Sequence, residues 1–286
     1  MDGYALNDIP RSGVENMALD QRLLEVAAAE QCLLLRVYRW LEPTLSLGYF
    51  QPYVQRLTHS HSSELPLVRR ATGGGAIVHH YDWTYCIAVP EQLSIRNERP
   101  RSGVKFGASQ PLYDCVHDGV VEWLGAQGIT ARKWANDCAA DTQHRFLCFK
   151  RRSCGDIVLA EHKVMGSAQR RARGAILQHG SLLLATSPYA PSLQGLSPTT
   201  ELTSQSLLDQ SLLSQSLHSQ SLLGRSNSPD ASPANLLTSF FEHLCHTLSA
   251  ATGITVQKVA DLSETPCQWH WPSPTQFADP QWTHRV

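Results

Sequence analysis

A run of three glycines at positions 73–75 constrains this chain more than any other feature of its sequence. Without Cβ atoms, the backbone there can adopt positive φ angles and let a ligand approach its N–H groups closely. Two arginines at 69–70 precede the glycines, and an apolar run that ends on His79 and His80 follows them. This pattern predicts a strand, a tight loop and a second strand. The arginines suit a phosphate or carboxylate bound at the loop, although a simple hairpin turn with charged flanks has the same features.

The charge of the chain is balanced overall but uneven along the sequence. Its 286 residues carry a formal net charge of −1, which gives no general attraction to nucleic acid. Basic residues nevertheless gather at 150–152 and 170–173, and such a local basic face suits an acidic protein partner or an anionic ligand. A merely solvated surface is the alternative. The length and a hydrophobic content of 42% are sufficient for one large domain or two small ones.

The cysteines and the N-terminal residues favour a cytoplasmic protein. None of the eight cysteines belongs to a CxxC pair, the chain starts without a signal-peptide pattern, and no apolar run reaches 18 residues. We therefore expect reduced thiols and no membrane contact. There is no HExxH motif, and the histidines at 59 and 61 lie in a polar, serine-rich stretch, so no metal site is expected.

The spacing of apolar residues divides the chain into helices and strands. Helical periodicity predicts helices over residues 15–27, 112–125 and 234–250. Alternating or continuous apolar runs predict strands over residues 33–40, 43–51, 67–69, 76–78, 84–89, 156–160, 163–169 and 175–184. Several antiparallel strands with the helices on one face predict an α+β fold with a mixed, largely antiparallel sheet.

Residues 204–223 contain four copies of a five-residue unit rich in serine, glutamine and leucine. A period of five matches neither the helix nor the strand, so no single face collects the leucines. The units are also far too short for a solenoid. We expect a disordered or loosely helical insertion on the surface.

Six short motifs follow one another between residues 15 and 185: Asn16 to Asp20, Ser46 to Gln51, Arg69 to His79, Asn136-Asp137, Lys163 to Gln169, and Leu177 to Ser181. In this order they resemble the family of lipoate-protein ligases and octanoyltransferases, whose domain is shared with biotin protein ligases. The resemblance implies a biotin/lipoate protein ligase-like catalytic domain over residues 1–190. A low-complexity, disordered insertion over 191–232 and a C-terminal helix and tail over 233–286, packing on the catalytic domain, would complete the chain.

The resemblance also implies a site, with Cys148 and Lys163 as its catalytic residues. The glycine loop would lie over an acyl chain or acyl phosphate, and its N–H groups would meet anionic oxygens together with Arg70. Small residues after Lys163 would leave room for a narrow aliphatic tunnel. The expected substrate-binding residues are Arg70, Thr72, Gly73, Gly74, Gly75, His79, Asn136, Asp137, Gly166, Ser167, Ala168, His179 and Gly180.

Taken apart from the family resemblance, the sequence predicts that Lys163 is an exposed strand lysine. It likewise predicts that Cys148 is a small core residue between two apolar neighbours. Within the family, an ammonium near a thiol favours the nucleophilic thiolate and stabilises the oxyanion that forms on attack. Cys154 follows two arginines in a polar loop, and the resemblance gives it no role.

The family contains two reactions. Ligases activate lipoate with ATP and magnesium, whereas transferases take octanoyl from acyl carrier protein through a cysteine thioester. Cys148-Phe149 and Thr84-Tyr85 resemble the cysteine-dependent octanoyltransferases, while Gly75 resembles the ligases, since the transferases often have arginine there. We expect an octanoyltransferase that needs no cofactor and acylates a lysine of a lipoyl domain or glycine-cleavage H protein. An ATP-dependent lipoate-protein ligase and an inactive carrier-binding module are the alternatives.

A biotin protein ligase would share Lys133-Trp134-x-Asn136-Asp137, but its arginine-rich GRGR loop is absent here. The acyl carrier and lipoyl domains of these families are generally acidic. The resemblance therefore gives the basic residues a role at the mouth of the site, where they would steer those carriers. The residues concerned are Lys150, Arg151, Arg152, Arg170 and Arg171.

Overall fold

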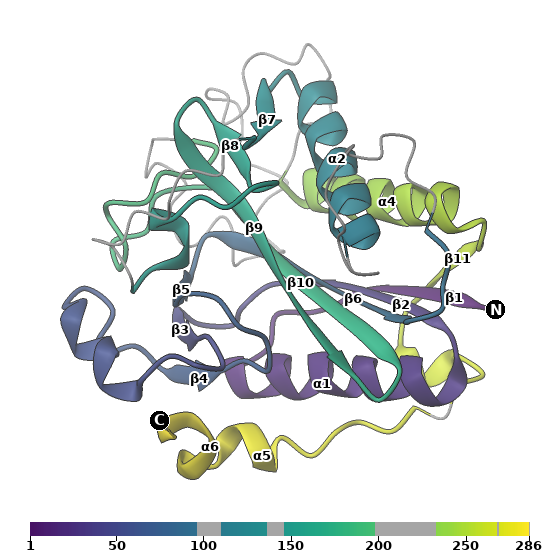
Figure 1. The fold of residues 1–286 in the computed structure, drawn as a ribbon, viewed down its shortest axis with the longest axis horizontal. Coiled ribbons are helices and arrows are strands. Elements are labelled where there is room, and N and C mark those ends of the chain that lie inside the picture. Colours follow the sequence, from purple (N-terminus) through teal and green to yellow (C-terminus); the bar gives the residue numbers. More distant parts are fainter. Residues whose placement is uncertain (96–109, 136–145, 198–232, 268, 286) are drawn as a thin grey trace.

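The computed structural model describes residues 1–95, 110–135, 146–197, 233–267 and 269–285 (Figure 1). Within these residues, one eight-stranded sheet has the strand order β11-β1-β2-β6-β10-β9-β8-β7. Its strands are β1 Gly3–Asn7, β2 Leu33–Tyr38, β6 Asp82–Pro90, β7 Ala131–Lys133, β8 Ile157–Leu159, β9 His162–Ala172, β10 Ala175–Leu183 and β11 Val256–Val259. β1 runs parallel to both β2 and β11, and the other neighbours are antiparallel. The predicted mixed, largely antiparallel sheet is confirmed.

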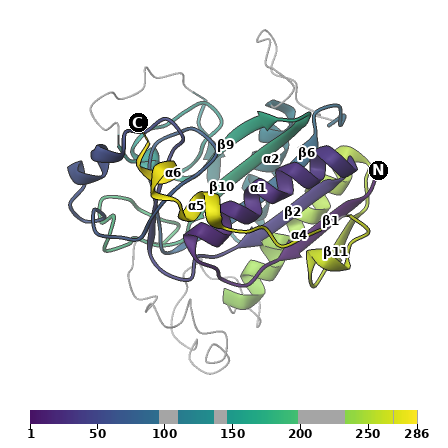
Figure 2. The same ribbon diagram turned by 90° about the horizontal axis from the view of Figure 1, so that it is seen from below.

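Helices cover both faces of this sheet, so the expectation of helices on one face is wrong. Helix α1, Gly13–Glu30, lies on one side, and α2, Gln110–Ala126, lies with α4, Pro233–Thr252, on the other (Figures 1 and 2). Alternate side chains of β2 explain this arrangement: Leu33 and Leu35 pack with α2 and α4, whereas Leu34 packs with α1. A continuous apolar strand is buried on both sides and therefore needs two helical layers.

The predicted helices are present, each a little longer than its apolar pattern. Helix α1 begins after Ser12, whose hydroxyl accepts the N–H of Glu15 while the Glu15 carboxylate accepts the N–H of Ser12. This capping box explains why the helix starts before the first periodic apolar residue. Strands β1, β7 and β11 were not predicted. Strands β7 and β11 lie at the two edges of the sheet and bury few side chains, so no apolar run marks them.

The glycine segment forms the predicted strand, loop and strand, but it is not a hairpin. Strands β4, Leu67–Arg69, and β5, Ile77–His79, do not pair with each other. Both pair with β3, Thr44–Leu47, with β4 parallel to it and β5 antiparallel. The glycine loop therefore passes over the end of β3, where a Cβ on Gly48 would lie 3.0 Å from the carbonyl carbon of Gly74.

The C-terminal tail returns to the face covered by α1. Short helices α5, Thr275–Ala278, and α6, Pro280–His284, follow one another there (Figure 2). The buried guanidinium of Arg69 donates to the carbonyls of Thr283 and Arg285, which ties the tail to β4. The pentapeptide repeat, Asn136 and Asp137 lie outside the described residues. Among the helices that are described, none has the length and hydrophobicity needed to cross a bilayer.

Candidate active site

A cavity of about 370 Å³ lies where the glycine loop meets β9 and β10, and its volume is in the range of small-molecule sites. It brings together residues from five of the six sequence motifs. The expected site residues in its wall are Arg70, Gly74, Gly75, His79, Cys148, Lys163, Gly166, Ser167, Ala168, His179 and Gly180. Thr72 and Gly73 are in the loop beside it, and Asn136 and Asp137 cannot be placed because they lie outside the described residues. Cys154, which was given no role, also lines the cavity.

Cys148 and Lys163 face each other in this cavity. Lys163 Nζ lies 3.7 Å from Cys148 Sγ and 2.8 Å from Asp156 Oδ2. The side chain of Lys163 is only 4% exposed, so it is not the exposed strand lysine that the isolated sequence suggests. Burial works to lower the pKa of Lys163, but the charges of Cys148 and Asp156 outweigh it and raise that pKa. Lys163 is therefore a buried ammonium held between a carboxylate and a thiol.

The backbone of the glycine segment positions Cys148. Ala76 N donates to the carbonyl of Phe146 at 2.8 Å, and Cys148 N donates to the carbonyl of Ala76 at 2.8 Å. A Cβ on Gly75 would lie 2.9 Å from Cys148 N and 3.0 Å from Cys148 Cα, which is too close for a side chain. Glycine at position 75 is thus required by the approach of the loop to the cysteine.

Asp156 is a site residue that sequence reasoning missed. Its carboxylate accepts Lys163 Nζ, the backbone N–H of Ser153 at 2.6 Å and the hydroxyl of Tyr113 at 3.2 Å. A Cβ on Gly166 would lie 2.6 Å from Lys163 Nζ, so the space that this glycine leaves is filled by the lysine side chain. In sequence, Asp156 is the first residue of the strand predicted over 156–160, and nothing marks it as a partner of Lys163.

His117 on α2 is a second residue that the sequence did not reveal. Burial lowers its pKa to about 3, so the ring is neutral. Nδ1 lies 2.7 Å from the carbonyl of Gly155, which requires the proton on Nδ1, and Nε2 then accepts the hydroxyl of Ser167 at 2.6 Å. His117 therefore holds the residue before Asp156 and also Ser167 in the cavity wall. It belongs to none of the six motifs.

His79 belongs to a relay that resembles the triad of a serine hydrolase. Asp82 Oδ2 lies 2.8 Å from His79 Nδ1, and His79 Nε2 lies 3.0 Å from the hydroxyl of Ser46. Ser46 is fully buried, however, and Arg70 also donates to its hydroxyl at 3.2 Å. The pKa of His79 is lowered by burial, and its ring stacks on Trp40 with centroids 3.8 Å apart. The relay links β3 to β5 in the wall of the cavity, and Arg70 shares the hydroxyl of Ser46 with it.

Arg70 stabilises the glycine loop through hydrogen bonds to its backbone. Its terminal nitrogens donate to the carbonyls of Ser46, Gly73 and Gly75 at 2.7–3.0 Å. Burial lowers the pKa of this guanidinium to about 10. Of the three nitrogens of this guanidinium, only the buried Nε has no hydrogen-bond partner among the described residues. The group expected to meet an anion is therefore largely committed to the backbone that forms the loop.

The five basic residues expected at the mouth of the site differ in what they contact. Arg151 lines the cavity, and Arg170 donates to the carbonyl of Ala71 at 3.2 Å in the glycine loop. Arg152 pairs with Glu161 at 3.0 Å, and Lys150 donates to a backbone carbonyl. Arg171 is exposed. Arg151 lies beside Gly75 and Arg170 beside Ala71, so the two arginines meet the loop at its two ends.

The family model described as the lipoyl protein ligase A/B catalytic domain matches residues 12–206. Because this match covers more than half of the chain, the protein belongs to that family. Octanoyltransferase LipM of Oceanobacillus iheyensis is 34% identical over 183 residues, which are 63% of this chain and 63% of that protein. Octanoyltransferase LipM of Carboxydothermus hydrogenoformans is 35% identical over 177 residues, 60% of this chain and 61% of that protein. The chain thus matches about three fifths of the length of these relatives.

Among solved structures, the putative lipoate protein ligase Ta0514 of Thermoplasma acidophilum has a TM-score of 0.64. The similarity covers 100% of both chains at 18% identity. At that identity the likeness concerns the fold alone, and it agrees with the lipoate protein ligase-like architecture expected from the sequence.

Proposed function

We propose that this protein is an octanoyltransferase that carries the acyl group on Cys148. The observation that supports this most directly is the pair formed by Cys148 Sγ and the buried Lys163 ammonium, 3.7 Å apart in one cavity. A thiol beside a fixed positive charge is a nucleophile in the setting that favours its thiolate. The octanoyltransferases among the relatives favour the same acyl group.

The reaction has two steps at the same sulfur. The Cys148 thiolate attacks the carbonyl of an octanoyl thioester on the phosphopantetheine of acyl carrier protein. A thioester forms on Cys148, and the pantetheine thiolate leaves and takes up a proton. An uncharged lysine ε-amine of a lipoyl domain or glycine-cleavage H protein then attacks the new thioester. An amide forms, the nitrogen releases a proton, and the Cys148 thiolate is regenerated. The thioester is already activated, so neither step consumes ATP.

Lys163 would act on the charge that develops in both steps. Each attack places a negative charge on the carbonyl oxygen, and a preorganised ammonium next to the sulfur stabilises that charge. Asp156 holds the ammonium in place through its 2.8 Å ion pair. The ligase alternative rests on Gly75, but this glycine is also required by the close approach of the loop to Cys148.

The function is tested by incubating the protein with octanoyl acyl carrier protein in the absence of ATP and measuring its intact mass. We expect a single octanoyl adduct, which disappears when a lipoyl domain is added and acquires the group. Octanoate or lipoate with ATP and magnesium serves as the second reaction. Formation of an acyl-adenylate there, with no adduct from the carrier protein, would contradict the transferase and support the ligase. Carrier binding without either product would support the inactive module.

The basic residues around the cavity provide a second prediction, concerning the acidic carriers. We expect charge reversal at Lys150, Arg151, Arg152, Arg170 and Arg171 to lower kcat/KM about tenfold or more at low salt. The difference should shrink in 0.5 M salt, because screening removes long-range attraction in wild type as well. Lys258 on β11, at the opposite edge of the sheet, is the control position for a charge reversal. An unchanged kcat/KM with an unchanged salt dependence in the five-residue variant would remove the steering role.

A further inference from the structure

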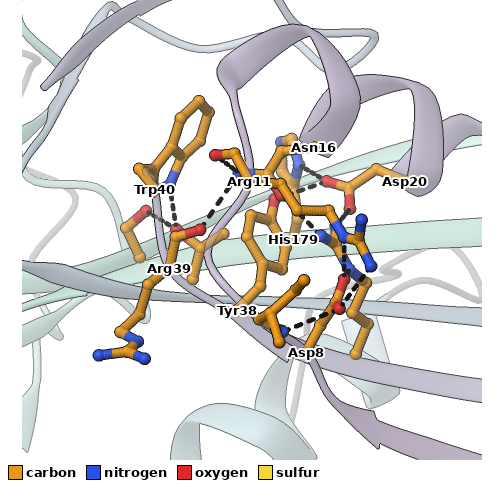
Figure 3. Close-up of polar contacts among 12 residues, drawn as sticks. Asp8, Arg11, Asn16, Asp20, Tyr38, Arg39, Trp40 and His179 are labelled. Atoms are coloured by element: carbon orange, nitrogen blue, oxygen red, sulfur yellow. Dashed lines mark hydrogen bonds and ion pairs between the residues drawn. The ribbon is translucent and has the colours of Figure 1, made fainter. Parts of the chain in front are cut away.

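His179 connects helix α1 to the glycine loop across the sheet. It lies on β10, where its Nδ1 is 3.1 Å from Asp20 Oδ2 and its Nε2 is 2.5 Å from Thr72 Oγ1. The carboxylate can only accept, so Nδ1 carries a proton, and Nε2 shares a hydrogen bond with the Thr72 hydroxyl. Figure 3 shows the ring of His179 directed toward Asp20 on α1. The three residues form a carboxylate–imidazole–hydroxyl chain that ends in the loop.

The carboxylate end of this chain is fixed by a buried network. Asp20 also accepts Arg36 NH1 at 3.3 Å and the hydroxyl of Tyr38 at 2.9 Å. Arg36 is fully buried and donates in addition to Asp8 at 2.8 Å and Asn16 at 2.6 Å. Every charge in the network thus has partners on α1, on β2 or just after β1. A carboxylate held from so many directions cannot move, so it sets the orientation of the imidazole.

The hydroxyl end of the chain leads to Cys148. Thr72 is 1% exposed and immediately precedes the three glycines. Its carbonyl accepts the N–H of Tyr49 at 2.8 Å, so both its side chain and its backbone are fixed. Four residues later, Ala76 bonds the backbone of Cys148. Glycines have no side chains to anchor them, so the position of this loop depends on the contacts at its ends and on Arg70.

We propose that Asp20 and His179 are positioning residues, which hold the Thr72 end of the glycine loop so that Cys148 stays opposite Lys163. His179 therefore acts through the hydroxyl of Thr72, although its ring also lines the cavity. This role explains why an acidic residue is buried on the apolar face of α1, in the motif Asn16 to Asp20. The catalytic consequence rests on the proposed octanoyl transfer, whereas the structural consequence does not.

The test removes the hydrogen bond between His179 and Thr72 and leaves the buried network around Asp20 intact. Thr72→Val keeps the shape of the side chain and deletes the hydroxyl, and Thr72→Ser keeps the hydroxyl and deletes a methyl group. Ser239→Ala is the control, since it deletes a hydroxyl that accepts Trp123 Nε1 at 3.1 Å between α4 and α2. Amide hydrogen exchange of residues 73–76 and the rate of Cys148 acylation are measured in each protein. Substitution of Asp20 is avoided, because it would remove one of the buried partners of Arg36 and the acceptor of the Tyr38 hydroxyl, and so disturb the network itself.

We expect Thr72→Val to speed exchange of the loop amides at least about tenfold and to slow acylation of Cys148 by about ten- to a hundredfold. Thr72→Ser should restore both within about threefold, and Ser239→Ala should change neither. Equal exchange in Thr72→Val and wild type, or equal impairment in Thr72→Ser and Thr72→Val, would overturn the proposal. If wild type forms no acyl adduct, octanoyl transfer fails as the function. The exchange measurement still decides whether Asp20, His179 and Thr72 position the loop.

Discussion

Cys148→Ala is expected to abolish the octanoyl adduct and to lower octanoyl transfer by at least about a thousandfold. The nucleophile is lost outright in this variant, and the rest of the site cannot replace it. The substitution is small and Cys148 is only half-buried, so the fold should be preserved. Intact mass after incubation with octanoyl acyl carrier protein measures the adduct, and transfer to a lipoyl domain measures turnover.

Two other cysteines make this experiment specific. Cys115 on α2 is half-buried, and burial raises the pKa of its thiol to about 12, so Cys115→Ala should behave like wild type. Cys154 lines the same cavity as Cys148 and is the competing candidate. An adduct that persists in Cys148→Ala but disappears in Cys154→Ala would transfer the role of nucleophile to Cys154.

Lys163→Met is expected to lower the rate of acyl loading by about a hundred- to a thousandfold, the effect typical of losing one preorganised group that stabilises an oxyanion. Methionine has a similar length and no charge. The variant should also lose stability, by about 3–5 kcal/mol, because Asp156 would remain buried without its cation. Single-turnover acylation and urea unfolding measure the two effects separately.

The double variant Lys163→Met with Asp156→Asn separates catalysis from stability. It removes both charges of the buried pair, so we expect most of the lost stability to return while acyl loading stays slow. A double variant that takes up the octanoyl group on Cys148 within tenfold of the wild-type rate would show that the Lys163 charge is not needed. The low rate of the single variant would then reflect only a disturbed fold.

The sequence predicted most of the helices and strands, and it also predicted the pair formed by Cys148 and Lys163. Apolar periodicity located α1, α2 and α4, because each buries one continuous stripe. The family resemblance named Cys148 and Lys163, which the fold brings to 3.7 Å from each other. The layering of the helices was predicted wrongly, with all of them on one face, since the sequence does not say which face of a two-sided strand each helix covers.

The sequence alone determined the family, through the order of its motifs, and predicted the mixed sheet and the loop at Gly73–Gly75. Apolar runs and glycine runs are local patterns, so they can be recognised without the fold. Only the tertiary structure decided which polar groups meet: Asp156 with Lys163, His117 with Ser167, and Asp20 with Thr72 through His179. Most of these partners come from elements far apart in the chain, and their hydrogen bonds need angles and distances that no spacing encodes. Burial makes those pairings obligatory, since a polar group removed from water must find a partner wherever the fold supplies one.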